Sequence, residues 1–300
     1  MIDQPSALSR FQKKLSWQDV ELSNIFPLLK ICVSEDIDNK GDITSKICQV
    51  KDSGVAALIA REEMVICGLP LIPLIIQEFQ IKSIHVQNNK VDGERAKKNE
   101  IIAYLHGNQK DILLVERTIL NFIQRLSGIS TLTKQYSTIL DKYKVGLLDT
   151  RKTTPGHRIL EKYATSCGGS YNHRMNLSDR ILIKDNHLAS HSIASTINFS
   201  GFIKKIVQKA DKEIVEVEID QIDHLVPAIE AEVDAVLLDN FTPEDVEKAV
   251  IINKNRVVLE ASGGIDLKSL EYFAKTKPHF ISTGAPIHSS RWIDIGLDWK

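Results

Sequence analysis

The sequence predicts an α/β protein in which an N-terminal α/β sandwich domain is followed by a (β/α) barrel of about seven parallel strands. Two observations predict this fold class. The first 110 residues alternate between strand pairs and helices, whereas short apolar runs recur from residue 145 onward. These later runs are rich in Val, Ile and Leu without polar alternation, which is typical of parallel strands buried on both faces. An open, doubly wound sheet is the alternative fold.

Local apolar spacing indicates the N-terminal elements in order. Residues 17–36 have the spacing of a helix, and a second helix starts within 69–80, where Pro73 is tolerable near the first turn. Turn residues separate the intervening extended segments, which we expect to pair as an antiparallel sheet. The expected strands lie within 53–70, 81–87 and 100–108.

A long amphipathic helix is predicted over 111–140, with a kink near Ser127 and Gly128. A polar stripe, at spacings of four and three residues, interrupts its apolar face. Such a stripe is either a solvated helix face or a functional surface. Its members are Arg117, Asn121 and Gln124, and the apolar stripe comprises Leu114, Val115, Ile119, Phe122, Ile123 and Leu126.

The barrel strands are the apolar runs that end in polar or charged residues. A weaker strand is expected at 168–174, and a helix at 242–255 has Thr242 as its N-cap. Helical or irregular segments connect the strands, as a parallel barrel requires. The expected strands lie within 145–151, 181–187, 213–220, 235–240, 256–264 and 279–285.

Composition excludes several classes of protein. The charged fraction of 26% and the net charge of −1 give no basic field that would favour nucleic acid. The longest apolar stretch, 68–79, is short and broken by two prolines, so we expect no membrane span. No signal peptide is recognisable at the N-terminus. Four cysteines without a CxxC pair indicate small buried side chains in a reducing compartment, which predicts a cytoplasmic protein.

Polar and charged residues follow the predicted barrel strands at the ends where barrel enzymes carry their sites. Any single cation there has the simpler interpretation of a solvated loop charge. The same pattern at consecutive strand ends instead predicts a mouth that binds a ligand with several negative charges. These residues are Arg151, Lys152, His173, Arg174, Lys184, Glu218, Asp239, Ser262, Gly263, Gly264, Thr283 and Gly284.

The two carboxylates among them, Glu218 and Asp239, would repel a phosphate directly. They either pair with the neighbouring cations or hold a divalent cation or ribose hydroxyls. The glycine-bearing turns at 262–264 and 283–285 allow backbone N–H groups to approach an anion closely.

The residues in these positions resemble those of the quinolinate phosphoribosyltransferase family. The resemblance rests on DTRKT, NHR and IKDNH within 149–187, and it covers nearly the whole chain. The family implies a reaction of quinolinate with phosphoribosyl pyrophosphate that gives nicotinate mononucleotide, carbon dioxide and pyrophosphate, with Mg²⁺ as cofactor. The further matching segments are 35–45, 61–70, 116–131, 216–220, 237–246, 259–265 and 281–290.

The resemblance implies a role for each matched residue. Arg151, His173, Arg174 and Lys184 correspond to quinolinate-binding positions, and Arg117 to an arginine donated in trans by the partner subunit of a homodimer. The remaining positions are those of the ribosyl donor. Lys152 and His288 match positions near its phosphates, Glu218 and Asp239 those near its ribose and Mg²⁺, and Ser262, Gly263, Gly264 and Gly284 a backbone cradle for phosphate.

The resemblance also implies an incomplete barrel and a final segment that returns to the first domain. The expected domains are 1–126 together with 287–300, and 127–286. His157 and Ser170 depart from the usual family pattern outside the matched positions. Three alternatives remain: a Schiff-base lyase that uses Lys184, a non-catalytic sensor of a phosphate ligand, and a molybdenum-associated paralogue, which tends to lack IKDNH.

Overall fold

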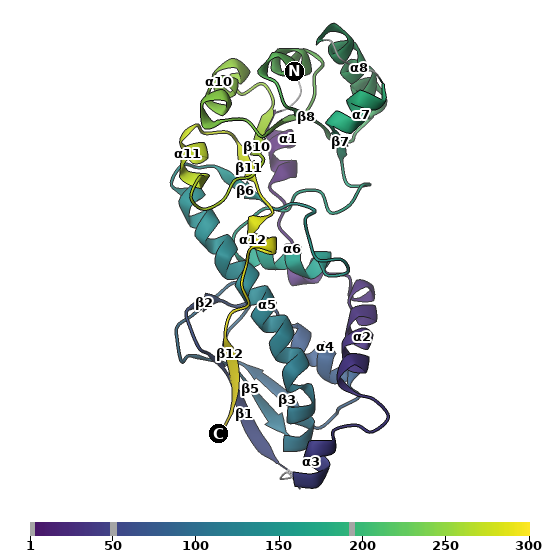
Figure 1. Ribbon diagram of the computed structural model, residues 1–300, viewed down its shortest axis with the longest axis vertical. Coiled ribbons are helices and arrows are strands. Elements are labelled where there is room, and N and C mark those ends of the chain that lie inside the picture. Colours follow the sequence, from purple (N-terminus) through teal and green to yellow (C-terminus); the bar gives the residue numbers. More distant parts are fainter. Residues whose placement is uncertain (1–3, 49–52, 192–195) are drawn as a thin grey trace. The chain divides into compact units, whose positions relative to one another are not determined.

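The computed structural model describes residues 4–48, 53–191 and 196–300. They form two compact units, each assembled from separate parts of the chain (Figure 1). The barrel unit comprises the described residues of 1–14, 135–153 and 170–288, and the sandwich unit those of 15–134, 154–169 and 289–300. The domain limits expected from the sequence stay a prediction.

Six parallel strands form the sheet of the barrel unit, in the order β6-β11-β10-β9-β8-β7. Each lies within one of the apolar runs expected to be a strand, which confirms those predictions. The weaker strand expected at 168–174 is reduced to one parallel bridge between Tyr171 and Leu148. The strands are β6 (Gly146–Leu148), β7 (Ile181–Ile183), β8 (Val215–Ile219), β9 (Ala235–Asp239), β10 (Val258–Ser262) and β11 (Phe280–Ser282).

Helix α10 (Pro243–Asn253) illustrates the local signals that bound a helix in this unit. The hydroxyl of Thr242 accepts a hydrogen bond from the backbone N–H of Asp245 at 3.2 Å, so the predicted N-cap is confirmed. Lys254 ends the helix in the left-handed conformation, at φ 49°. The other helices are α7 (Asp185–Ser190), α8 (Thr196–Lys209), η3 (Ile222–His224), α9 (Leu225–Glu230), α11 (Leu270–Lys275) and α12 (Ala285–His288).

Helix α1 (Gln4–Phe11), which the sequence analysis did not anticipate, packs into the core of the barrel unit. Phe11 is fully buried, and its ring stacks on that of Phe280 with centroids 5.8 Å apart. Burial of such an aromatic side chain contributes on the order of 2–3 kcal/mol. The N-terminal residues therefore complete a core whose other members come from distant strands.

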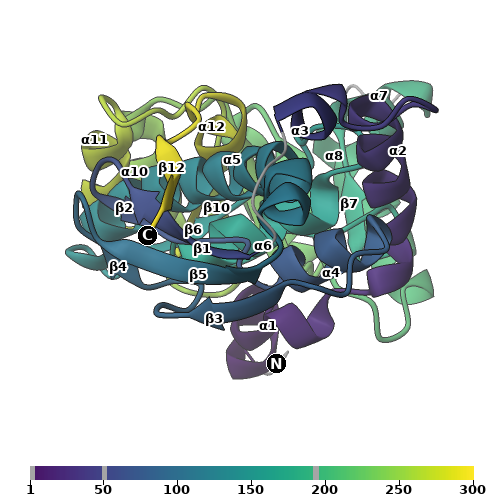
Figure 2. The ribbon, with the colours of Figure 1, turned by 90° about the horizontal axis from the view of Figure 1, so that it is seen from below.

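The sandwich unit contains a four-stranded antiparallel sheet in the order β12-β1-β5-β3. Figure 2 shows β1, β5 and β3 side by side. The edge strand β12 comes from the last residues of the chain and pairs Ile295–Trp299 with 56–60 of β1. The strands are β1 (Gly54–Ala60), β3 (His85–Asn88), β5 (Ile101–Gly107) and β12 (Ile295–Trp299), with a separate pair, β2 (Met64–Val65) and β4 (Arg95–Ala96).

The long helix α5 (Gln109–Asp141) is continuous through Ser127 and Gly128. Its stripe side chains from Val115 to Leu126 are buried, whereas Leu114 is half-buried. Of the polar stripe, Arg117 and Asn121 are exposed, but Gln124 donates a hydrogen bond to the carbonyl of Ile295 at 2.9 Å. Gln124 is thus a structural residue that ties α5 to β12.

The remaining helices of the sandwich unit partly match the predictions. The helix expected at 17–36 is divided into two 3₁₀ turns and one α-helix. The second expected helix begins at Leu71, with Pro73 in its first turn, as predicted. These elements are η1 (Trp17–Asp19), η2 (Leu22–Asn24), α2 (Phe26–Asp36), α3 (Ile43–Cys48), α4 (Leu71–Glu78) and α6 (Arg158–Cys167).

The cysteines differ from the expectation of four buried side chains. All four are free thiols, but Cys48 is exposed, Cys32 and Cys167 are half-buried, and only Cys67 is buried. The Sγ atoms of Cys67 and Cys167 lie 3.7 Å apart within the sandwich unit. Burial raises the pKa of the Cys67 thiol, which therefore stays protonated at neutral pH.

No helix among the described residues combines the length and the apolar character that crossing a bilayer would require. A cytoplasmic location stays a prediction.

Candidate functional site

A cavity of about 280 Å³ opens where the strands of the barrel unit end. The two-residue repeat of a strand directs alternate side chains to the same face, so the last inward-facing residues of neighbouring strands meet there. Most of the residues predicted at the strand ends therefore line one cavity. Its lining is Thr150, Arg151, Lys152, His173, Arg174, Leu182, Lys184, Glu218, Leu237, Asp239, Glu260, Ser262 and Ser282.

Five of the sequence-predicted basic residues line this cavity: Arg151, Lys152, His173, Arg174 and Lys184. The side chains of His173 and Arg174 are buried. Burial and the neighbouring Arg151 lower the pKa of Arg174, which means that its charge is incompletely compensated. A bound anion would supply that compensation, so the geometry favours a ligand that carries negative charge.

Lys184 and Glu218 form an ion pair, in which Nζ of Lys184 donates to Oε2 of Glu218. Burial raises the pKa of Glu218, although Lys184 acts in the opposite direction. Pairing with a neighbouring cation was one of the two interpretations of Glu218 in the sequence, and the structure shows that pair. The Lys184 side chain therefore serves a carboxylate here, an arrangement that the Schiff-base alternative does not call for.

The floor of the cavity holds a buried group that sequence reasoning missed. Nε2 of His173 lies 3.4 Å from Oε2 of Glu216 and 3.6 Å from Oε1 of Glu260. Both glutamates are fully buried, and Arg180 also approaches Glu216, with Nη1 3.3 Å from Oε2. Each glutamate stands two residues before a residue that we had singled out, Glu218 or Ser262. A glutamate within an apolar strand, two residues before a predicted site residue, faces the same side as that residue. This signal could have identified both Glu216 and Glu260.

The two buried glutamates differ in charge state. Burial raises the pKa of Glu216, but His173 and Arg180 outweigh it and bring that pKa to about 2. Burial and the adjacent Glu216 raise the pKa of Glu260 to about 7, against the opposing influence of His173. Two carboxylates this close repel each other when both are ionised. Glu216 is therefore ionised, while Glu260 holds a proton near neutrality.

The predicted glycine turn at 262–264 has positive φ angles, which glycine adopts most readily. Gly263 has φ +104°, and a Cβ there would lie 2.3 Å from Oδ1 of Asn240. At Gly284, a Cβ would lie 3.1 Å from Cβ of Lys152 and 3.0 Å from Cδ2 of His288. The structure thus brings Gly284, Lys152 and His288 together.

Several predicted site residues stand outside the cavity lining. Gly263, Gly264, Gly284 and His288 belong to the barrel unit but do not line the cavity. Arg117 is exposed on α5 in the sandwich unit and does not line it either.

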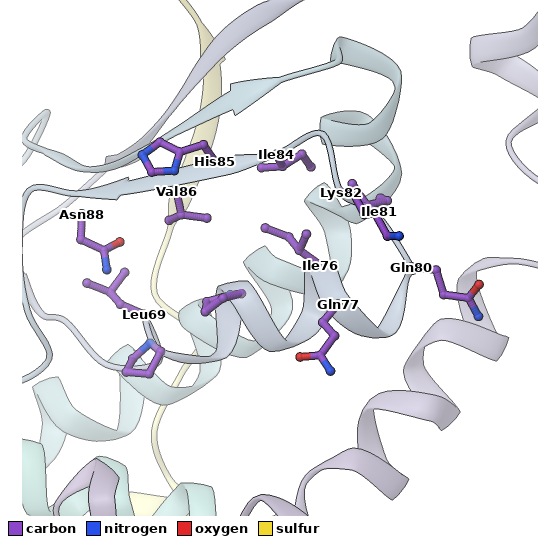
Figure 3. A pocket seen from close by; sticks show the side chains of 12 residues that line it. Leu69, Ile76, Gln77, Gln80, Ile81, Lys82, Ile84, His85, Val86 and Asn88 are labelled. Carbon is purple, nitrogen blue, oxygen red and sulfur yellow. The ribbon is translucent and has the colours of Figure 1, made fainter.

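A second cavity, of about 760 Å³, lies in the sandwich unit between α4 and the start of β3. Figure 3 shows Leu69, Ile76 and Val86 turned towards the space between these elements. Its lining is largely apolar, with Lys82 and His85 as its basic side chains and no carboxylate, so it lacks the cluster of cations that lines the smaller cavity. We therefore assign the candidate active site to the smaller cavity.

Two family models match most of the length of the chain. Residues 129–298 match the C-terminal domain of quinolinate phosphoribosyl transferase, and residues 42–127 match its N-terminal domain. The chain is 41% identical to the probable nicotinate-nucleotide pyrophosphorylase [carboxylating] of Bacillus subtilis (strain 168), over 88% of this chain and 89% of that protein. It is 33% identical to the nicotinate-nucleotide pyrophosphorylase [carboxylating] of Mycobacterium leprae (strain TN), over 93% and 99%.

The fold leads to the same relatives. The structure of the nicotinate-nucleotide pyrophosphorylase from Francisella tularensis superposes with a TM-score of 0.87 at 40% identity, over 94% of this chain and 98% of that one. Sequence, fold and a cation-lined cavity at the strand ends therefore agree that the chain belongs to the quinolinate phosphoribosyltransferase family.

Proposed function

We propose that this protein transfers the phosphoribosyl group of phosphoribosyl pyrophosphate to quinolinate, with loss of one carboxylate, in the synthesis of NAD. The products are nicotinate mononucleotide, carbon dioxide and pyrophosphate. The observation that supports this proposal is the cavity in which Arg151, Arg174 and Lys184 converge beside Glu218 and Asp239, in a chain of this family. Both substrates carry several negative charges, which such a mouth stabilises.

Quinolinate binds through its two adjacent carboxylates. Arg151 and Arg174 offer guanidinium groups that match a carboxylate in a bidentate manner, and His173 and Lys184 supply further donors. Because Arg174 is buried with incompletely compensated charge, a substrate carboxylate relieves that imbalance when it binds. Lys184 then divides its donors between the substrate and Glu218.

The ribosyl donor occupies the strand ends on the other side of the cavity. Lys152, His288 and Gly284 lie together and serve its phosphate groups, with Ser262, Gly263 and Gly264 as a backbone cradle. Reaction at the ribosyl carbon develops positive charge there while pyrophosphate leaves. This chain therefore acts mainly by orientation and electrostatic stabilisation, with no side-chain nucleophile.

Glu218 and Asp239 fit a magnesium ion by their chemistry. They are oxygen donors at the ends of the adjacent strands β8 and β9, and both line the cavity. Each also has a polar partner, since Glu218 pairs with Lys184 and Oδ2 of Asp239 accepts from Asn240 at 2.8 Å. Bound Mg²⁺ would neutralise charge on the pyrophosphate group.

A homodimer completes the site in this proposal. Arg117 is exposed, and its side chain forms no hydrogen bond or ion pair with the described residues of its own unit. The resemblance of 116–131 to the family supports its insertion into the active site of a partner subunit, where it would bind quinolinate.

The proposal is tested by incubating the purified protein with quinolinate, phosphoribosyl pyrophosphate and Mg²⁺. We expect pyrophosphate, carbon dioxide and nicotinate mononucleotide in equal amounts. A parallel reaction with nicotinate, which lacks one carboxylate, should be at least about 100-fold less efficient because buried cations are left unpaired. Absence of pyrophosphate with quinolinate, in a correctly folded protein, would exclude the proposed function.

A further inference from the structure

The proposed reaction requires a proton at a defined carbon. When the carboxylate next to the ring nitrogen leaves as carbon dioxide, the electron pair of the broken C–C bond remains on ring carbon 2. Nicotinate mononucleotide carries hydrogen at that carbon, so one proton must be delivered for each carbon dioxide released. The inference below rests on the proposed function and concerns the source of that proton.

Glu260 is the acidic side chain best placed to hold this proton. It stands in the middle of β10, is fully buried and lines the cavity. Neither carboxyl oxygen has a well-aligned hydrogen bond among the described residues, although Ser282 and Glu216 are close neighbours and Nε2 of His173 lies 3.6 Å from Oε1. A fully buried carboxyl with only long or poorly aligned contacts is costly, which favours a functional role for Glu260.

The groups that face Glu260 keep it protonated while leaving it reactive. Glu216 on β8 is held ionised by Arg180 and His173, so its negative charge opposes a second charge on Glu260. His173 and Arg180 act in the other direction and stabilise the carboxylate once the proton has left. The other titratable or charged groups that line the cavity are Arg151, Lys152, Arg174, Lys184, Glu218 and Asp239.

The other cavity donors are less suited to this step. Nε2 of His173 is directed to the two glutamates, and Nζ of Lys184 is bound to Glu218. Guanidinium groups do not release a proton near neutral pH. Lys152 is assigned to the phosphates of the ribosyl donor, and Glu218 and Asp239 to Mg²⁺. Among the described residues that line the cavity, Glu260 is therefore the acid without another assigned role.

We propose that Glu260 is a catalytic acid that protonates ring carbon 2 as carbon dioxide departs. The C–C bond to the carboxylate breaks, its electron pair stays on carbon 2, and the Glu260 O–H proton forms the new C–H bond. Glu260 becomes a carboxylate and takes a proton from solvent before the next turnover, so charge and atoms balance. Failure of this proton transfer allows carbon dioxide to recombine with the ring, so its net release slows.

The test is a single-turnover reaction of the Glu260→Gln protein, in which pyrophosphate and carbon dioxide are quantified separately. The amide preserves shape but cannot supply an acidic proton. We expect pyrophosphate release within about threefold of the unchanged protein, and carbon dioxide release slower by 100-fold or more. A nucleotide that retains both carboxylates should accumulate. Carbon dioxide release at the original rate would overturn the inference.

A second variant provides an independent measurement if the glutamine protein folds poorly. Glu260→Ala leaves space on the cavity floor that formic acid can occupy. We expect added formate to restore carbon dioxide release at least tenfold, and more strongly at lower pH, because the acid form is the donor. An equal concentration of chloride should restore nothing. Lack of rescue in a folded Glu260→Ala protein would argue that Glu260 only shapes the site.

Glu161→Gln is the matched control, since Glu161 is a buried glutamate that does not line the cavity. Any loss in this variant should affect pyrophosphate and carbon dioxide equally. If the protein without substitutions releases no pyrophosphate, the proposed function is refuted, and with it the role of Glu260. Normal pyrophosphate release with no separation of the two products in Glu260→Gln would refute the role of Glu260 alone.

Discussion

Arg125 and the buried Glu161 form a partly buried ion pair in the sandwich unit, with Nη2 of the arginine 2.8 Å from Oε1 of the glutamate. Glu161 also accepts hydrogen bonds from the backbone N–H of Thr154 at 2.8 Å and from its hydroxyl at 2.9 Å. Arg125 in turn donates to Oγ of Ser290 at 2.8 Å. One pair of side chains therefore joins three segments that are far apart in sequence.

Removing one partner of this pair should destabilise the protein strongly. Glu161 is 1% exposed, so Glu161→Ala leaves the Arg125 charge without compensation. We expect the free energy of unfolding of the sandwich unit to fall by about 3–5 kcal/mol, measured by denaturant titration. Glu247→Ala, at an exposed position of α10, should change stability by less than about 0.5 kcal/mol. A similar small loss in both variants would contradict this prediction.

Arg174→Ala should lower catalytic efficiency without loss of the fold. A bidentate charged contact with a substrate carboxylate is worth about 2–4 kcal/mol, so kcat/KM for quinolinate should fall by roughly 30- to 1000-fold. The control is Arg10→Ala, whose guanidinium donates to the carbonyl of Lys212 at an exposed site. Full activity of a folded Arg174→Ala protein would show that this residue does not contact substrate.

The carboxylates at the strand ends should affect the ribosyl donor more than quinolinate. Glu218→Ala and Asp239→Ala remove oxygen ligands for Mg²⁺, so KM for phosphoribosyl pyrophosphate and the Mg²⁺ requirement should rise at least tenfold. Asp220→Ala, an exposed carboxylate two residues beyond Glu218, should leave both unchanged. Steady-state kinetics at several Mg²⁺ concentrations provide the measurement. Normal donor kinetics in both variants would mean that these carboxylates only pair with neighbouring groups.

Donation of Arg117 between subunits predicts complementation. Arg117→Ala and Lys184→Ala chains should each be nearly inactive alone. After subunit exchange, each heterodimer should contain one site with both lesions and one site with neither. Activity should therefore recover to about one quarter of the unchanged protein under random pairing. No recovery, with exchange demonstrated by native mass spectrometry, would indicate that Arg117 does not act in trans.

Stability should depend on pH through Glu260. Its pKa in the folded protein, about 7, is above the ordinary value of 4.5, so the folded state binds the extra proton. The resulting stabilisation is present below pH 4.5 and is lost as pH rises through 7. Glu260→Gln cannot ionise, so we expect it to gain about 2–3 kcal/mol relative to the unchanged protein between pH 5 and pH 8. A constant difference in the free energy of unfolding across this range would contradict the prediction.

Much of the barrel and its mouth could be predicted because strand ends leave a local signal. An apolar run such as 235–240 ends in Asp239, and its neighbours along the chain end in the same manner. Parallel strands have their carboxyl ends at the same edge of the sheet. Their convergence could therefore be predicted without knowing which residues are in contact. The resemblance to the family added the probable roles of residues, which no periodicity could supply.

The missed features depend on contacts that local patterns do not encode. Glu216 and Glu260 become a pair only because β8 and β10 place their inward faces around one centre, with His173 between them. Lys184 reaches Glu218 through a side-chain conformation that sequence leaves open. Cys48 is exposed because α3 ends there, and hydrophobicity alone does not decide that outcome.

The pairing of β12 with β1 has a consequence for folding during synthesis. Residues 54–107 leave the ribosome early, but their sheet obtains its edge strand only after Trp299 has been translated. Meanwhile α1 is translated long before Phe280, the residue on which the Phe11 ring stacks. Neither unit can therefore mature as a nascent domain, and exposed apolar edges must persist throughout elongation. Such a chain should depend on ribosome-associated chaperones more than a protein whose domains are contiguous in sequence.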